Sequence, residues 1–157
     1  MQTDVNDYKN FNSLFNPHKS DVIIKLEVFM TDKLMTGMMF EESRVVGKED
    51  TAEFHGSGDL PVYATPAMVA LMEYAAKELV KPGLAPYETT VGTRMEVSHL
   101  KATPVGNEVS AKAKLLEIQG RKMTFTIEAY DGETLIGQAV HERAVVDRER
   151  FMAKLIK

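Results

Sequence analysis

The chain of 157 residues contains no cysteine. Disulfide bonds, thiol nucleophiles and thiolate metal sites are therefore excluded, and a reducing cytoplasm is the expected location. No apolar run approaches the roughly 18 residues that a membrane-spanning helix needs. The N-terminal residues also lack the charged and then apolar pattern of a signal peptide. We therefore expect a protein that does not bind a membrane.

Several enzyme signatures are missing as well, namely the P-loop, GxSxG, HExxH and the Rossmann fingerprint. His18 and His55 lie in apparent loops without the spacing of metal ligands, so we expect neither a metal ion nor a cofactor. The net charge is −4, with acids and bases interspersed, and this argues against a nucleic-acid partner.

What is present is the composition of an ordinary globular protein, 44% hydrophobic and 27% charged. The length predicts one domain. Residues 1–33 are polar and rich in asparagine, and we interpret them as an N-terminal extension that includes a short strand at 22–29. Residues 34–157 form the predicted domain.

One segment has the pattern of a buried helix, over residues 66–80. Thr65 suits the N-cap, and Pro66 suits the first helical position. The sequence KPG at 81–83 is expected to end the helix. Apolar side chains surround the helix, which indicates burial on every side. Glu73 is the only charged residue of its central part, so a carboxylate is predicted in the middle of a buried helix.

After the helix the hydrophobic period changes to two, which predicts strands at 91–100, 108–118, 123–130 and 133–146. Short turns join these strands, including Asp-Gly at 131–132, so we expect them to be antiparallel. The alternation slips at Leu116, which predicts a bulge. An α+β fold follows, in which a curved antiparallel sheet wraps one helix. The side of the helix that the sheet leaves uncovered predicts a second subunit and thus at least a homodimer.

Glu73 and His99 are the first candidate functional residues. A carboxylate is rarely buried without a partner, so Glu73 leans toward solvent, pairs with an arginine, or serves as an acid, base or nucleophile in a cleft. Alternation places His99 with Val91, Met95 and Val97 on the face toward the helix. A lone histidine there is more often a core residue, but the nearby carboxylate favours a site.

Four further positions have two interpretations each. Thr65 is a helix cap, or a hydroxyl placed where the helix N-terminus favours negative charge. Gly92, which alternation places on the opposite strand face from His99, marks a bulge or close approach, or offers its N–H to a ligand carbonyl. His141 and Arg143 share one face of the last strand and by themselves resemble an edge or interface pair.

Four segments together resemble the fluoroacetyl-CoA-thioesterase-like branch of the hot-dog-fold thioesterases. They are VYATPAMVALMEYAA, VGTRMEVSHLKATPVG, QGRKMTFTIEAYDG and HERAVVDRERF, and the match runs from about Leu34 to about Leu155. The resemblance implies a long central helix wrapped by an antiparallel sheet, assembly as a homodimer or a tetramer, and hydrolysis of an acyl-CoA thioester to a carboxylic acid and CoA.

The resemblance also implies the site residues. The family's catalytic threonine, glutamate and histidine fall on Thr65, Glu73 and His99. Its substrate-contacting glycine and arginine fall on Gly92 and Arg143. Glu73 would then attack the thioester or activate a water molecule for the attack, and CoA would be part of the substrate rather than a cofactor.

One departure from the family bears on specificity. The fluoroacetate specialist has an aromatic-rich lid before its helix, whereas this chain has no aromatic residue between Phe54 and Tyr63. The resemblance therefore implies thioester chemistry more than selectivity for fluoroacetyl groups.

Two other functions stay open. A hot-dog hydratase or dehydratase would place its histidine before the helix in a GHP-like context, which is not found here. A non-catalytic acyl-CoA-binding module is the third possibility, and regulators of that kind carry a helix-turn-helix that residues 1–33 do not resemble.

Overall fold

The computed structural model describes residues 33–156, so the short strand expected at 22–29 lies outside the described residues. In chain order the elements are β1 (Met39–Val45), the 3-10 turn η1 (Lys48–Asp50), α2 (Ala52–His55), α3 (Thr65–Val80), the 3-10 turn η2 (Lys81–Gly83), β2 (Glu88–His99), β3 (Glu108–Gln119), β4 (Lys122–Asp131), β5 (Thr134–Asp147) and α4 (Arg148–Ala153). One helix and the four strands after it were predicted, and they are confirmed.

The strands form one antiparallel sheet in the order β1-β3-β4-β5-β2. The turns after β3 and β4 join neighbouring strands, as expected for hairpins. The register shift between Leu115 and Glu117 confirms the predicted bulge at Leu116. The link between β2 and β3, residues 100–107, is longer and is not a hairpin, because β4 and β5 lie between these two strands.

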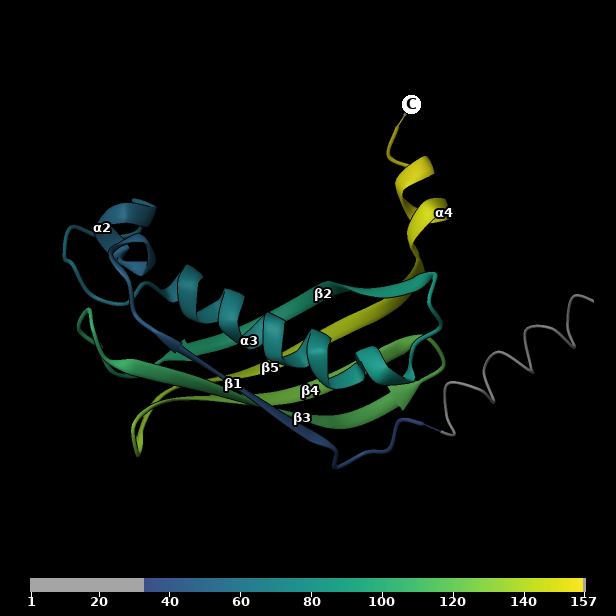
Figure 1. Cartoon of the computed structure of the whole chain (residues 1–157), viewed down its shortest axis with the longest axis horizontal. Helices are drawn as coiled ribbons and strands as arrows, with labels where there is room; N and C mark the ends of the chain where they lie inside the picture. Colours follow the sequence, from purple (N-terminus) through teal and green to yellow (C-terminus); the bar gives the residue numbers. More distant parts are fainter. Residues whose placement is uncertain (1–32, 157) are drawn as a thin grey trace, which may run out of the picture.

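Helix α3 lies lengthwise over one face of the curved sheet, and α4 projects away from that sheet after β5 (Figure 1). The helix buries apolar side chains against the sheet: Ala67, Met68, Leu71, Met72, Ala75, Ala76, Leu79 and Val80. Each Å² of apolar surface that this contact removes from water stabilises the fold by roughly 25 cal/mol.

The other side of α3 is open, as expected for a helix that the sheet alone covers. Thr65, Pro66, Ala70 and Tyr74 are exposed there, and Glu73 is partly exposed. These positions lie on one face because a helix repeats every 3.6 residues. The sheet covers one side of the helix only, which is why an all-round apolar pattern needs a further covering surface.

Thr65 begins α3 rather than capping it. The N-cap residue is Ala64, and no side chain bonds the free N–H groups of the first turn at this end. Proline is therefore the second helical residue. The Thr65 hydroxyl makes its hydrogen bond elsewhere, with the imidazole of His99.

The face assignment along β2 is wrong at Gly92, and the cause is a bulge. The register with β5 shifts between Gly92 and Arg94, so Thr93 is an extra residue in the ladder. Gly92 is paired with Arg143 and Met95 with His141, which places both on the side toward α3. Val91, not Gly92, therefore lies on the other face from His99, because one inserted residue inverts a period of two.

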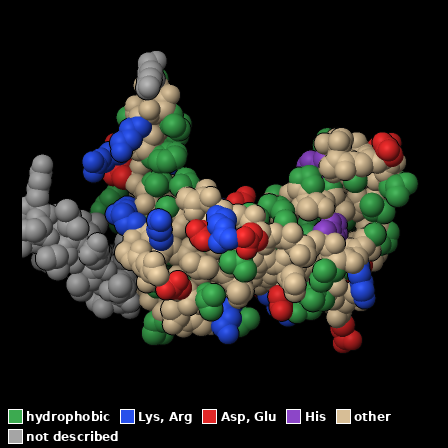
Figure 2. Space-filling model, turned by 180° about the vertical axis from the view of Figure 1, so that it is seen from behind, with side chains coloured by type: hydrophobic (Ala, Val, Ile, Leu, Met, Phe, Trp, Pro, Cys, Tyr) green, Lys and Arg blue, Asp and Glu red, His purple; other side chains and the backbone are tan. Residues whose placement is uncertain are grey.

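On the face shown in Figure 2, acidic and basic side chains are interspersed over the middle of the molecule. Within residues 33–156, no helix is long and apolar enough to cross a bilayer.

Neighbouring leucines at the β3 bulge provide a test of the core. Leu115 is fully buried, whereas Leu116 is 52% exposed. We expect Leu115→Ala to lower the free energy of unfolding by about 2–5 kcal/mol, because it leaves a cavity. Leu116→Ala is the control, with an expected change within about 0.5 kcal/mol. Urea denaturation at one fixed protein concentration measures both, and equal losses would contradict this packing.

Candidate active site

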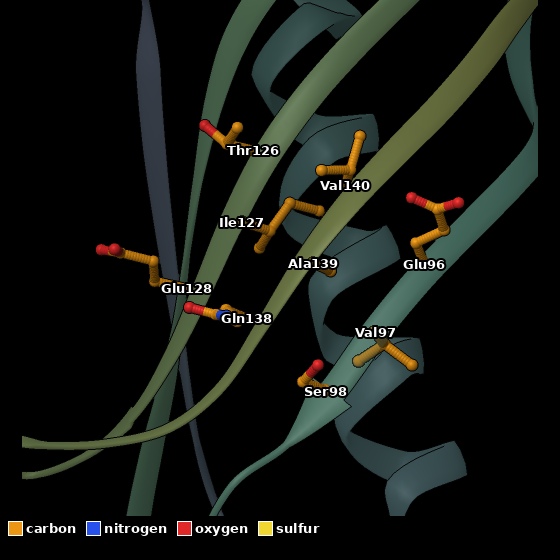
Figure 3. Close-up of a pocket in the computed structure, with 9 residues that line it drawn as sticks. All are labelled: Glu96, Val97, Ser98, Thr126, Ile127, Glu128, Gln138, Ala139 and Val140. Carbon is orange, nitrogen blue, oxygen red and sulfur yellow. The ribbon is translucent and has the colours of Figure 1, made fainter.

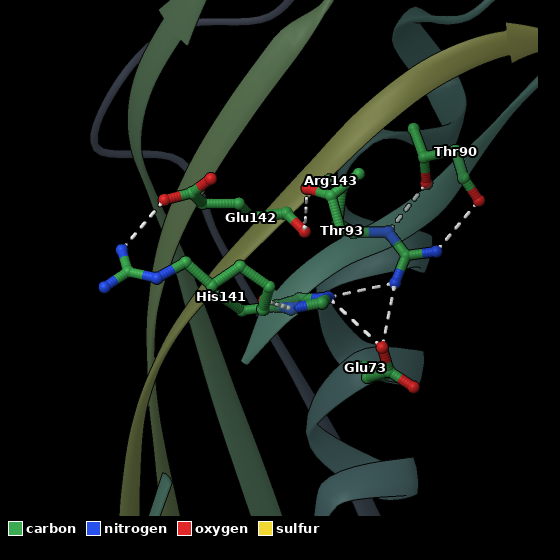
Figure 4. A network of polar contacts seen from close by, with 7 residues as sticks. Glu73, Thr90, Thr93, His141, Glu142 and Arg143 are labelled. Atoms are coloured by element: carbon green, nitrogen blue, oxygen red, sulfur yellow. Dashed lines mark hydrogen bonds and ion pairs between the residues drawn. The ribbon is translucent and has the colours of Figure 1, made fainter. Parts of the chain in front are cut away.

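Glu73 lies on the open side of α3 and faces two residues of β5. Its Oε1 atom is 3.8 Å from Arg143 Nη1 and 3.6 Å from His141 Nε2 (Figure 4). The Glu73 side chain is 42% exposed, whereas the two β5 side chains are buried. Of the alternatives for this carboxylate, the structure shows two at once: Glu73 leans to an open surface and contacts an arginine.

Gly92 permits this arrangement by having no side chain. A Cβ at Gly92 would stand 2.6 Å from Glu73 Oε1 and 3.1 Å from His141 Cε1. A contact of 2.6 Å is shorter than carbon and oxygen atoms tolerate, so a side chain there would displace the carboxylate. Close approach of α3 to β2 therefore accounts for the glycine, which is one of the two interpretations its position in the strand had left open.

Arg143 is held by hydrogen bonds on all three guanidinium nitrogens. Nε donates to Thr90 Oγ1 at 2.8 Å, and Nη2 donates to the Thr90 carbonyl oxygen at 2.9 Å. Nη1 is 3.0 Å from His141 Nε2. Burial lowers the pKa of Arg143, although a guanidinium keeps its charge in proteins. A fixed positive charge therefore stands behind the Glu73 carboxylate.

His141 is completely buried, and the expectation of an edge pair with Arg143 is wrong. Strand β5 lies between β4 and β2, and the faces of both residues turn toward α3. His141 Nδ1 is 2.8 Å from the carbonyl oxygen of Arg94. Burial lowers the pKa of the imidazole, and the neighbouring Arg143 lowers it further.

A second polar cluster lies at the start of α3. Thr65 Oγ1 and His99 Nδ1 are 2.9 Å apart, and the His99 ring meets the ring of Tyr63 edge-on at 6.5 Å between centroids. Burial, followed by the nearby Asp50 carboxylate, raises the pKa of Tyr63 to about 12, so its hydroxyl is neutral.

This end of α3 also holds buried polar atoms without partners. Within residues 33–156, the buried side-chain atoms that lack a hydrogen bond are Tyr63 Oη, His99 Nε2 and Thr103 Oγ1. Tyr63 N–H donates to the Thr103 carbonyl oxygen, so the three residues are neighbours. Leaving such an atom unpaired costs about 1–3 kcal/mol. Unpaired buried atoms therefore mark a place where a ligand or water could bind.

The structure thus divides the five predicted residues between two clusters. Glu73, Gly92 and Arg143 lie together, and Thr65 lies with His99. Eight helical residues separate Thr65 from Glu73, which is about 12 Å along the axis of α3. In the described part of the chain, no hydrogen bond or ion pair joins the two clusters.

Thr90 and Tyr63 belong to these clusters but were not among the predicted residues. Thr90 precedes Gly92 by two positions and so shares its strand face, a relation that alternation could have shown. No sequence pattern marks Tyr63, because its role depends on the ring of His99, which is distant in sequence.

A separate pocket lies on the opposite face of the sheet from α3 (Figure 3). Its lining includes Glu96, Ser98, Glu128 and Gln138, and none of the residues of the two clusters lines it. Within residues 33–156, no group of three or more histidine, aspartate or glutamate side chains is arranged to hold a metal ion.

Comparisons with known proteins identify the family of the chain. The family model for the fluoroacetyl-CoA-specific thioesterase matches residues 46–149. A relative from Streptantibioticus cattleyicolor, a fluoroacetyl-CoA thioesterase, is 37% identical over 132 residues, which are 80% of this chain and 95% of the relative.

Solved structures give the same result. A mutant of the fluoroacetyl-CoA-specific thioesterase, crystallised with fluoroacetate and CoA, is 35% identical and superposes with a TM-score of 0.71 over 75% of this chain and 99% of that one. A hot-dog-like protein from Thermanaerovibrio acidaminovorans, at 21% identity, shares the fold with a TM-score of 0.73 over 80% of this chain and 93% of that one.

The single helix on a curved antiparallel sheet is therefore the hot-dog fold, and the class of protein is that of the thioester hydrolases. The chain belongs to the fluoroacetyl-CoA-specific thioesterase family.

The buried His141 makes stability depend on pH. Its pKa in the folded protein lies below the ordinary value of 6.5, so the unfolded chain binds a proton that the folded chain resists. The free energy of unfolding should therefore fall as the pH drops below about 6.5, by at most about 1.4 kcal/mol per pH unit from this residue. His141→Gln should show a shallower fall between pH 7 and pH 5 in urea denaturation, and parallel curves would contradict the assignment.

Proposed function

We propose that the protein is an acyl-CoA thioesterase that uses Glu73, Thr65 and His99 to hydrolyse a thioester to a carboxylic acid and CoA. The observation that carries this proposal is the carboxylate of Glu73, which lies on the open side of α3 against Gly92 with a buried cation behind it. The relatives support acyl-CoA as the substrate class, because they are fluoroacetyl-CoA thioesterases and one of them was crystallised with CoA.

Glu73 is the group that starts the attack on the thioester. It bonds the thioester carbon itself, or it removes a proton from a water molecule that does so. Its partial exposure and its loose contacts of 3.6 and 3.8 Å leave the carboxylate accessible to a substrate. Gly92 leaves room for the thioester carbonyl to approach a backbone N–H that stabilises the developing oxyanion. Arg143 holds the carboxylate in place.

Thr65 and His99 support the transfer of a proton to or from the attacking group. Their separation of 2.9 Å is a hydrogen bond between a hydroxyl and an imidazole, which is the geometry of a proton relay. The unpartnered atoms of Tyr63, His99 and Thr103 lie beside this pair, and a bound substrate or water would supply the missing hydrogen bonds.

The acyl group is broader than fluoroacetyl in this proposal. The segment between Phe54 and Tyr63 has no aromatic side chain, Phe54 is 69% exposed, and Tyr63 is buried toward His99. Thiol release from a series of acyl-CoA substrates, from acetyl to long-chain, tests this. Strong preference for fluoroacetyl-CoA alone would contradict it.

Replacement of Glu73 tests the catalytic assignment. We expect Glu73→Gln to lower kcat by at least about a hundredfold in the thiol-release assay, because the amide can neither attack nor accept a proton. Glu78→Gln is the control, since Glu78 lies on the same helix and only pairs with Lys77 and Lys81.

An unchanged kcat in Glu73→Gln would overturn the assignment. Hydration of crotonyl-CoA, or tight acyl-CoA binding without thiol release by the unsubstituted protein, would overturn the thioesterase proposal itself. A single turnover in ¹⁸O-labelled water detects direct attack, because ¹⁸O enters the Glu73 carboxylate only when water opens a Glu73–acyl anhydride at the Glu73 carbon, whereas a water activated by Glu73 places its oxygen in the product acid.

We also propose that the protein acts as a homodimer. Strand β2 is an edge of the sheet over 12 residues, and its outer backbone groups are a template for pairing with another strand. The open side of α3 faces the same region and exposes Ala70 and Tyr74. A second copy paired along β2 would cover this side of the helix and enclose both polar clusters.

Substitution on the open side of α3 tests the dimer. We expect Ala70→Arg to convert the dimer to a monomer in analytical ultracentrifugation and to lower activity, since a long cation cannot be covered in an apolar interface. Ser43→Arg, on the opposite edge strand β1, is the control. A monomeric unsubstituted protein with full activity would contradict the proposal.

A further inference from the structure

His141 is a fully buried titratable group with no part in the reaction proposed above. It comes from the middle of β5 and lies between the backbone of β2 and the guanidinium of Arg143 (Figure 4). Its ring also stacks at a tilt on Phe125, with 6.2 Å between centroids. A buried imidazole is costly unless its ring nitrogens find partners, and here both do, so the identity of these partners decides the state of the ring.

The two hydrogen bonds of the ring determine its tautomer. The carbonyl oxygen of Arg94 can only accept, so Nδ1 carries the proton and donates it across 2.8 Å. Arg143 Nη1 can only donate, so Nε2 is unprotonated and accepts across 3.0 Å. A second proton on His141 would direct an N–H group at the N–H groups of a cation. The neutral ring with Nδ1–H is the state that satisfies both partners.

Charged groups around the ring agree with a neutral imidazole. Arg143 on β5 lies beside Nε2, Glu73 on α3 lies 3.6 Å from the same atom, and Glu142 follows in the chain. Burial and Arg143 lower the pKa of His141, against the opposing effect of the two carboxylates and of the Arg94 carbonyl. The contact between His141 and Glu73 is therefore not an ion pair, and within residues 33–156 Arg143 is the cation that contacts Glu73.

Arg143 depends on His141 for the hydrogen bond of its third guanidinium nitrogen, Nη1. Thr90 binds Nε and Nη2, which fixes one edge of the guanidinium. Nη1 is the nitrogen that contacts Glu73, at 3.8 Å, and His141 is its hydrogen-bond acceptor. Since the acceptor lies on Nη1 itself, it decides where this nitrogen points relative to the carboxylate.

We propose that His141 is a positioning residue for the thioesterase reaction: its unprotonated Nε2 anchors Arg143 Nη1, and Arg143 in turn holds the Glu73 carboxylate in its attacking position. This proposal rests on the proposed function in that Glu73 is taken as the reacting group. His141 Nε2 lies 3.6 Å from Glu73 Oε1, but as an unprotonated nitrogen it donates no hydrogen bond to the carboxylate and acts on it through Arg143.

Two substitutions separate the two hydrogen bonds of the ring. The amide of Asn in His141→Asn can reach the Arg94 carbonyl but offers no acceptor at the Nε2 position. The longer side chain of His141→Gln can present its amide oxygen to Arg143 Nη1. We expect His141→Asn to lower kcat by about tenfold to a hundredfold, with a smaller change in KM, because a displaced catalytic group acts in the chemical step. His141→Gln should keep kcat within a few-fold.

Thr93→Ala is the matched control. Thr93 lies in the β2 bulge, and its hydroxyl donates to the Glu142 carbonyl oxygen at 3.2 Å without touching Arg143. Its kcat should not change. An unchanged kcat in His141→Asn would overturn the proposal. So would an equal loss of kcat in the Asn and Gln variants that follows their melting temperatures, because that result indicates packing alone.

Nuclear magnetic resonance of ¹⁵N-labelled histidine provides a readout that does not depend on turnover. We expect His141 to show one protonated and one unprotonated ring nitrogen from pH 8 down to pH 6, with the proton on Nδ1. Protonation of both nitrogens above pH 6, or a proton on Nε2, would overturn the anchor. If the unsubstituted protein released no thiol from any acyl-CoA, the proposed function would fail, and the spectrum would still decide the anchor.

Discussion

The close approach of α3 to β2 at Gly92 is the contact on which the candidate site depends. A side chain at that position would occupy the place of the Glu73 carboxylate, 2.6 Å from the Cβ it would carry. The glycine faces the helix only because Thr93 is inserted in the ladder between β2 and β5. Helix packing, strand bulge and carboxylate position therefore form one arrangement: deletion of the inserted residue, or a side chain at Gly92, would displace the carboxylate.

The polar groups beneath α3 show what this arrangement costs. A buried guanidinium is unfavourable unless its donors and its charge are satisfied. Thr90 and His141 satisfy the donors of Arg143, and Glu73 lies near its charge. Apolar side chains of equal volume would often be as stable or more so. A network of this kind in the core of a small sheet is therefore better explained by function than by stability.

Local sequence patterns predicted the elements and failed where one strand met another. The helix over α3, the turns after β3 and β4 and the bulge at Leu116 follow from period, glycine and proline, which act within a few residues. The strand face predicted for Gly92 was wrong, because a one-residue bulge cannot be recognised when each strand is considered alone. His141 and Arg143 were assigned to an edge because the pattern of one strand does not show its place in the strand order of the sheet.

The sequence by itself determined the family to which the chain belongs, and the resemblance predicted Thr65, Glu73, Gly92, His99 and Arg143 as the site residues. It also determined that one carboxylate stands among apolar residues of one helix. Only the tertiary structure decided which groups meet. It joined Thr65 to His99, 34 residues away, and Glu73 to Arg143 and His141 on β5. Such contacts depend on strand order and register, which arise from the packing of the whole sheet rather than from the pattern of any one segment.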